Sequence, residues 1–168
     1  MNHAKSKVQW CLDKAKKELQ EGKKHRGLIK IEPNYTLSKN HLFKAERNLK
    51  VTLYLQKGGY TDWCSSSLFY TIYHCFLAIL AKFGYETRNQ ECTFAVIADL
   101  INNKKIDLEL SDLEKISFIG NMHESNSVLS IREEYQCGTK VSLENKEYEG
   151  LLYLTKKILD KTKEILIG

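Results

Sequence analysis

The chain has 168 residues, of which 42% are hydrophobic, so it can bury the core of one domain, with or without a short appendage. Its most apolar run, residues 68–81, holds about fourteen residues, whereas a membrane-spanning helix needs roughly twenty. In a secretory signal an apolar block follows the basic N-terminal residues, and this sequence has no such block there. These features argue against a membrane protein and a secreted one, and we expect a soluble protein in the cytoplasm with no membrane partner.

The net charge of +5 is distributed unevenly along the chain. Residues 1–40 hold ten Lys and Arg against four Asp and Glu, a net +6, whereas the remainder holds sixteen against seventeen, a net −1. Such a basic segment either lies against phosphate groups or is the solvated face of a Lys-rich helix, and both interpretations stay open.

The five cysteines form no CxxC pair and have no paired histidine spacing. We therefore expect reduced, mostly buried thiols in place of a disulfide framework or a zinc site, with no metal and no cofactor. The residues are Cys11, Cys64, Cys75, Cys92 and Cys137.

Apolar residues recur at spacings of three and four almost throughout, and the chain has one proline, so the sequence predicts an all-α protein. The first helix, residues 5–20, ends at Gly22, a natural left-handed cap, and the loop after it closes at Pro33. We place a domain boundary here. Residues 1–34 form a basic N-terminal helix and loop appendage, and residues 35–168 form a helical bundle domain.

The bundle domain contains five further predicted helical segments. The fourth of them opens at a capping box, in which Ser111 accepts from the amide of Glu114, and is expected to run, with a kink near Gly120, as far as Gln136. Helices joined by short loops favour an antiparallel up-and-down bundle, with a four-helix core plus the extra N-terminal helix. The other predicted segments are residues 37–56, 61–84, 90–101 and 143–166.

The helix over residues 61–84 is apolar on two sides at 100° per residue. Phe69, Ile72 and Phe76 represent one side, and only a narrow strip around Thr71 and Cys75 is left for water. A helix that is apolar on two sides must be covered on two sides. We expect the second side to meet either a deeper core layer or a second copy in a symmetric dimer. That second side carries Trp63, Ser66, Ser67, Tyr70, Tyr73, His74, Leu77 and Ala81.

Two places on these helices have side chains suited to binding. His74 lies one turn after Tyr70, so the two side chains can touch, and they either form part of the core or hold a base over a groove. Arg132 and Gln136 are one turn apart on a predicted helix, and the planar fork of Arg132 suits a phosphate or a carboxylate. The alternative for Arg132 is an ion pair with Glu133 or another surface carboxylate.

Three segments in this order resemble an archaeal and bacterial group of the HEPN superfamily (higher eukaryotes and prokaryotes nucleotide-binding). They are "VQWCLDKAK", "YTDWCSSSLFYTIYHCFLAILAKFGYETRNQECTFAVI" and "IREEYQCG". The resemblance extends from about Val8 to Leu166. It implies a compact helical bundle that commonly forms a homodimer, is often encoded beside a minimal nucleotidyltransferase, and serves in toxin–antitoxin or defence systems.

The resemblance also implies a possible activity, because some HEPN proteins are metal-independent ribonucleases that carry an Arg followed four to six residues later by His. This chain departs from that motif, since none of its five histidines follows an arginine at that spacing. It also has Gln90 before "ECT", where related sequences often have a histidine before "DCT". Cleavage without a metal needs a base near neutral pKa and a cation. Arg132 supplies the cation, and the base would have to be His74, His123 or a tyrosine.

Three hypotheses of function follow. In the first, the protein is a HEPN-like binding module that holds a nucleotide, single-stranded RNA or a nucleotidyltransferase partner, without the ribonuclease motif. In the second, it is a metal-independent ribonuclease toxin with a displaced base, for which Arg132 and His74 are the catalytic candidates. In the third, it is a structural dimer without a ligand. The candidate binding residues are Arg132, Gln136, Tyr70, His74, Tyr73 and Gln90.

Overall fold

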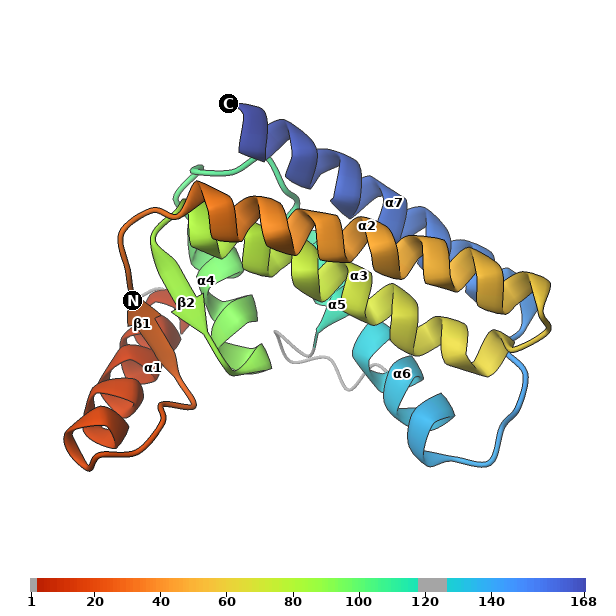
Figure 1. The fold of residues 1–168 in the computed structure, drawn as a ribbon, viewed down its shortest axis with the longest axis horizontal. Helices are drawn as coiled ribbons and strands as arrows, with labels where there is room; N and C mark the ends of the chain where they lie inside the picture. The colour runs from red at the N-terminus through yellow and green to blue at the C-terminus, as the bar shows by residue number, and fades with distance from the viewer. Residues whose placement is uncertain (1–2, 118–126) are drawn as a thin grey trace.

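The computed structural model describes residues 3–117 and 127–168, and these form a helical bundle with one small two-stranded sheet (Figure 1). The all-α prediction is therefore confirmed. In chain order the elements are α1 (His3–Gln20), β1 (Leu28–Lys30), α2 (Tyr35–Lys57), α3 (Thr61–Lys82), β2 (Tyr85–Thr87), α4 (Gln90–Asn102), α5 (Leu110–Ile116), α6 (Val128–Cys137) and α7 (Asn145–Ile167).

The centre of the fold is α3, which packs against α2, α4, α6 and α7. The helices α2 and α3 form an antiparallel hairpin, with α7 alongside (Figure 1). The hairpin is defined by local signals: the side chain of Asn34 caps α2 by accepting from the amide of Leu37 at 2.8 Å. At the other end, Gly59 reverses the chain with a φ of +82°, a conformation that favours glycine.

The strip of α3 that was expected to face water is buried. Thr71, Cys75 and Ala78 have no exposed surface, because α2 and α7 both lie on that side of the helix. The hydroxyl of Ser38 in α2 donates to the carbonyl of Ala78 at 2.7 Å. The prediction of the water-facing strip was therefore wrong, and α3 meets water elsewhere along its surface.

By length and composition α3 is able to cross a membrane, with a mean hydropathy of 1.4 over its most apolar window. The helix extends beyond the apolar run of residues 68–81 at both ends, so its length alone does not argue against a membrane. The burial of α3 does argue against a membrane-spanning helix, since 67% of that window lies inside the fold. Such burial is typical of the core helix of a soluble protein.

The chain between α4 and α7 differs from the predicted kinked helix. Ser111 does not cap a helix, because α5 already begins at Leu110 and the Ser111 hydroxyl donates to the Glu109 carboxylate at 3.3 Å. After α5, Ser117 has extended backbone, and α6 begins separately where the Ser127 side chain accepts from the amide of Ser130. The capping box and the single helix to Gln136 were therefore wrong, and the kink expected near Gly120 lies outside the described residues.

The sheet was not predicted. It pairs β1 with β2 in antiparallel register, with Leu28 opposite Thr87 and Lys30 opposite Tyr85. Gly84 makes the approach possible, because its φ is +77° and a Cβ there would lie 2.8 Å from the carbonyl oxygen of Ile31. The sheet thereby joins the segment after α1 to the segment after α3.

Two cysteines distant in sequence join α1 to α4. Cys11 and Cys92 form a disulfide, with their Cα atoms 5.9 Å apart. The expectation of reduced thiols was therefore wrong for this pair. The two cysteines are 81 positions apart in the sequence, so no local spacing rule indicates that they pair. Cys64 and Cys75 are buried free thiols, as expected, whereas Cys137 is free and exposed.

The hydrophobic core extends into the N-terminal segment. Ala4 and Val8 of α1 belong to the same buried cluster as the apolar residues of α3 and α4. The domain boundary at residue 34 stays a prediction, and the structure adds that α1 packs on α4 and β1.

Candidate functional site

Four rings and one guanidinium form a continuous row from α2 through α3 to α6. We call this set the ring row: His41, His74, Tyr73, Phe69 and Arg132.

The spacing within the ring row is that of direct contact. The His41 and His74 rings stack with centroids 5.3 Å apart, and Tyr73 meets His74 edge-on at 6.3 Å. Tyr73 and Phe69 stack at 6.0 Å, and the guanidinium carbon of Arg132 lies 4.7 Å above the centre of the Phe69 ring. A cation over an aromatic face is attracted by the ring's negative face, so Phe69 positions Arg132.

Arg132 has hydrogen-bonding capacity that the described residues do not use. Its side chain is 14% exposed, and none of the described residues accepts a hydrogen bond from its buried Nε. One terminal nitrogen lies 3.5 Å from Glu133, whose carboxylate is more than half exposed, so this ion pair is weak. The predicted alternative of pairing with Glu133 is thus present but leaves a donor unsatisfied. Buried donors without a partner are uncommon in proteins and often mark functional groups.

The two histidines share one hydrogen bond, with their Nδ1 atoms 3.0 Å apart. One Nδ1 must carry a hydrogen and the other must accept it, so at least one of the two rings is neutral. Burial, followed by His41 and Lys44, lowers the pKa of His74 to about 4. Burial also lowers the pKa of His41, partly offset by Glu86. Both rings are therefore uncharged at neutral pH.

Tyr73 is held in place by α4. The hydroxyl of Thr93 donates to the phenol oxygen of Tyr73 at 3.5 Å, and burial raises the pKa of Tyr73. Tyr73 is therefore a neutral phenol at physiological pH. Gln90 begins α4 three residues before Thr93, and among the described residues no hydrogen bond connects its side chain to the ring row.

Tyr70 and Trp63 form the exposed edge of α3. Tyr70 packs edge-on against Phe69 at 5.4 Å and is 39% exposed, and Trp63 is 56% exposed. Among the residues that the structure describes, no deeper core layer covers this edge, so the prediction of a deeper core layer was wrong for Tyr70 and Trp63. The water-facing surface of α3 thus runs along its Tyr70 side.

Gln136 does not join the ring row. It lies on the same helix as Arg132, as predicted, but lines a separate hollow of about 230 Å³ beside Asp62, Trp63 and Ser66. Of the six predicted binding residues, the structure brings together Tyr70, Tyr73, His74 and Arg132.

Sequence reasoning missed His41 and Phe69 as members of this cluster. The signal for His41 was available, because it lies three residues after Ser38 and four before Ala45, both buried on α2. Phe69 was assigned to the opposite side of α3 from Tyr70, although adjacent residues on a helix are only 100° apart.

Among the described residues no three His, Cys, Asp or Glu side chains gather in a way that could hold a metal ion. No protein-family model matches the chain, and no curated protein matches it either.

Proposed function

We propose that this chain is a HEPN-like protein that binds a nucleotide or single-stranded RNA, with Arg132 holding a phosphate. The observation that carries the proposal is the guanidinium of Arg132, which lies on Phe69 with its Nε unsatisfied among the described residues. The planar fork of arginine is suited to bidentate contact with phosphate oxygens.

The surroundings of Arg132 support a ligand with both a phosphate and a base. Tyr70 exposes part of its ring and contacts the same Phe69 that carries Arg132. A base stacked on Tyr70 would therefore lie within one ring of the phosphate-binding group. Stacking on an aromatic side chain is the usual way in which proteins hold an unpaired base.

The ring row favours binding over cleavage. A general base works best when its pKa lies near the operating pH, whereas the pKa of His74 is about 4. Tyr73, with its raised pKa, is also a poor base at neutral pH. The ribonuclease alternative would need single-stranded RNA to be cut without added metal, and cleavage that His74→Gln abolishes would establish it against the binding module.

The biological role is inferred only from the resemblance to the HEPN superfamily. A toxin–antitoxin or defence role, a nucleotidyltransferase partner and a cytoplasmic location therefore belong to the proposal. So does the homodimer, for which the exposed side chain of Trp63 on α3 is the proposed contact. Co-purification of the chain with its neighbouring gene product would test the partner, and failure to form a complex would contradict it.

The proposal predicts that Arg132→Ala weakens binding of adenosine triphosphate by about 10- to 100-fold, because a charge-assisted contact contributes roughly 1.5–3 kcal/mol. Arg132→Lys should give an intermediate loss, since lysine keeps the charge without the fork. Isothermal titration measures both. Arg47→Ala, which removes an exposed arginine from α2, is the matched control and should bind normally.

Thermal unfolding of the same variants separates binding from folding. If Arg132→Ala lowers the melting temperature markedly and leaves affinity unchanged, the guanidinium has a structural role on Phe69 and the proposed site is wrong.

A further inference from the structure

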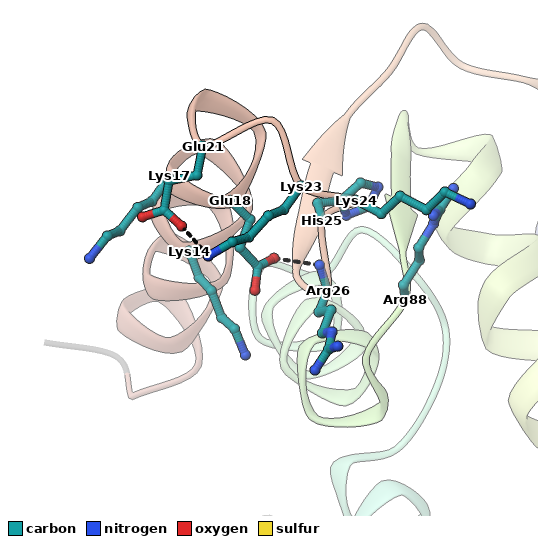
Figure 2. A pocket seen from close by; sticks show the side chains of 9 residues that line it. All are labelled: Lys14, Lys17, Glu18, Glu21, Lys23, Lys24, His25, Arg26 and Arg88. Carbon is teal, nitrogen blue, oxygen red and sulfur yellow. Dashed lines mark hydrogen bonds and ion pairs between the residues drawn. The ribbon is translucent and has the colours of Figure 1, made fainter.

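A hollow of about 840 Å³ lies away from the ring row, around the C-terminal half of α1 (Figure 2). Figure 2 shows basic side chains reaching it from α1, from the loop that follows α1, and from Arg88 just after β2. We call it the basic hollow. Its lining residues are Lys14, Lys17, Glu18, Glu21, Lys23, Lys24, His25, Arg26 and Arg88.

The basic hollow carries an uncompensated positive charge. Six Lys and Arg side chains and two carboxylates line the hollow, a net +4 without counting histidine, and within the described ranges only Arg88 pairs with a carboxylate outside it, Glu86 at 3.7 Å. Both carboxylates are already engaged, since Glu21 pairs with Lys23 at 2.8 Å and Glu18 accepts from the backbone amide of Arg26. Among the described residues no carboxylate pairs with the other lysines of the hollow or with the Arg26 guanidinium.

His25 adds a second sign of an incomplete environment. The residue is 5% exposed and forms part of the wall of the basic hollow. Its Nδ1 is buried without a hydrogen-bond partner among the described residues, while its Nε2 lies 3.9 Å from Glu86. A buried nitrogen of this kind normally has a partner, and the hollow beside it is rich in groups that attract anions.

An exposed aromatic ring lies at the edge of this surface. Trp10 precedes Lys14 by one turn of α1 and is 49% exposed. The ammonium groups of Lys7 and Lys14 lie 4.4 and 5.2 Å from the centre of its ring. Proteins that bind single strands combine a basic groove for the phosphates with exposed aromatic rings for the bases.

We infer that the basic hollow binds the phosphodiester backbone of a single-stranded nucleic acid, with Trp10 stacking on a base. The several basic side chains of the hollow suit more than one phosphate, and the ring selects a nucleic acid over a bare phosphate chain. This site is separate from Arg132 and does not rest on the proposed function. It would make the N-terminal segment a docking surface for a strand.

The test is fluorescence anisotropy of a labelled oligouridylate titrated at several sodium chloride concentrations. The double variant Lys17→Ala/Lys24→Ala should bind about tenfold more weakly at low salt. The slope of log affinity against log salt should also become shallower by about 1.4, because each lost phosphate contact on a single strand contributes roughly 0.7. The matched control is Lys50→Ala/Lys57→Ala, which removes the same charge from exposed positions on α2.

Two further arms identify the ligand and the site. Trp10→Ala should weaken oligouridylate binding while leaving binding of inorganic polyphosphate unchanged, and Trp10→Phe should restore most of the loss. Arg47→Ala, at an exposed position on α2, should leave the salt slope intact. If the Lys17/Lys24 variant behaves like its control, the inference is wrong even where Arg132 binds a nucleotide. If Trp10→Ala has no effect on oligouridylate, the nucleic-acid assignment is wrong.

Discussion

At the scale of single residues, the most constrained groups are the two histidines that share one hydrogen bond between α2 and α3. Because their Nδ1 atoms are 3.0 Å apart, protonation of both rings would place two donors and two positive charges face to face. Burial and the nearby Lys44 further disfavour the charged form of His74. The shared hydrogen bond therefore requires that at least one of the two rings is neutral.

This arrangement predicts a loss of stability in acid. The pKa of His74 is about 4 in the folded protein and 6.5 without the surrounding structure, so the unfolded chain binds protons first as the pH falls. Stability contributed by the neutral ring is present above about pH 6.5 and decreases progressively towards pH 4. The melting temperature of the unaltered protein should therefore fall over that pH range, and it should fall less in His74→Gln.

The comparison needs a control because carboxylates also titrate near the lower end of this range. His3→Gln, which changes an exposed histidine at the start of α1, should reproduce the pH profile of the unaltered protein. Identical profiles for His74→Gln and His3→Gln would contradict the role of the pair.

At the scale of elements, periodicity and turn residues were sufficient for the long helices. The predicted segments 37–56 and 90–101 differ from α2 and α4 by no more than two residues at either end. Such helices combine a repeating apolar face with a cap, for example Asn34, and each signal supports the other. The helical class of the fold was therefore readable from sequence.

The short elements were not readable in this way. The strands β1 and β2 have three residues each, which is too short for an alternating pattern, and their pairing depends on Gly84 meeting the chain near Ile31. The helix α5 is only seven residues long, and the motif taken for its cap lies inside it. These elements exist because of contacts between distant segments, which a local pattern does not contain.

The candidate site was predicted in part for the same reason. Helical spacing placed Tyr70, Tyr73 and His74 on one side of α3, and the chemistry of arginine singled out Arg132. No local rule indicated that α6 would lay Arg132 on Phe69, or that α2 would bring His41 to His74. Sequence thus identified the residue types, and tertiary packing decided which of them meet.

At the scale of the whole molecule, the exposed edge of α3 bears on the proposed dimer. We expect light scattering to give about twice the 19.5 kDa of one chain, because a second copy would remove the exposed Trp63 side chain from water. Trp63→Lys should shift the protein to a monomer, since a charge in an apolar interface is costly. A monomer at micromolar concentration would contradict the proposal.

A matched change on another face is the control for that variant. Tyr153 of α7 is more exposed than Trp63. Tyr153→Lys therefore introduces the same charge away from the proposed contact. It should leave the mass unchanged.

The Cys11–Cys92 disulfide affects how the chain behaves when a protease cleaves it. The loop after α1 is exposed at Lys23 and Lys24, two positions at which trypsin cleaves. Cys11 lies before such a cut and Cys92 lies after it, so the disulfide would hold the two pieces together as one covalent molecule. The pieces would then migrate together on a non-reducing gel. Adding a reductant should release a small N-terminal peptide, and Cys92→Ser should release it without reductant after denaturation. Early release from the unaltered protein would show that the bond is absent in solution.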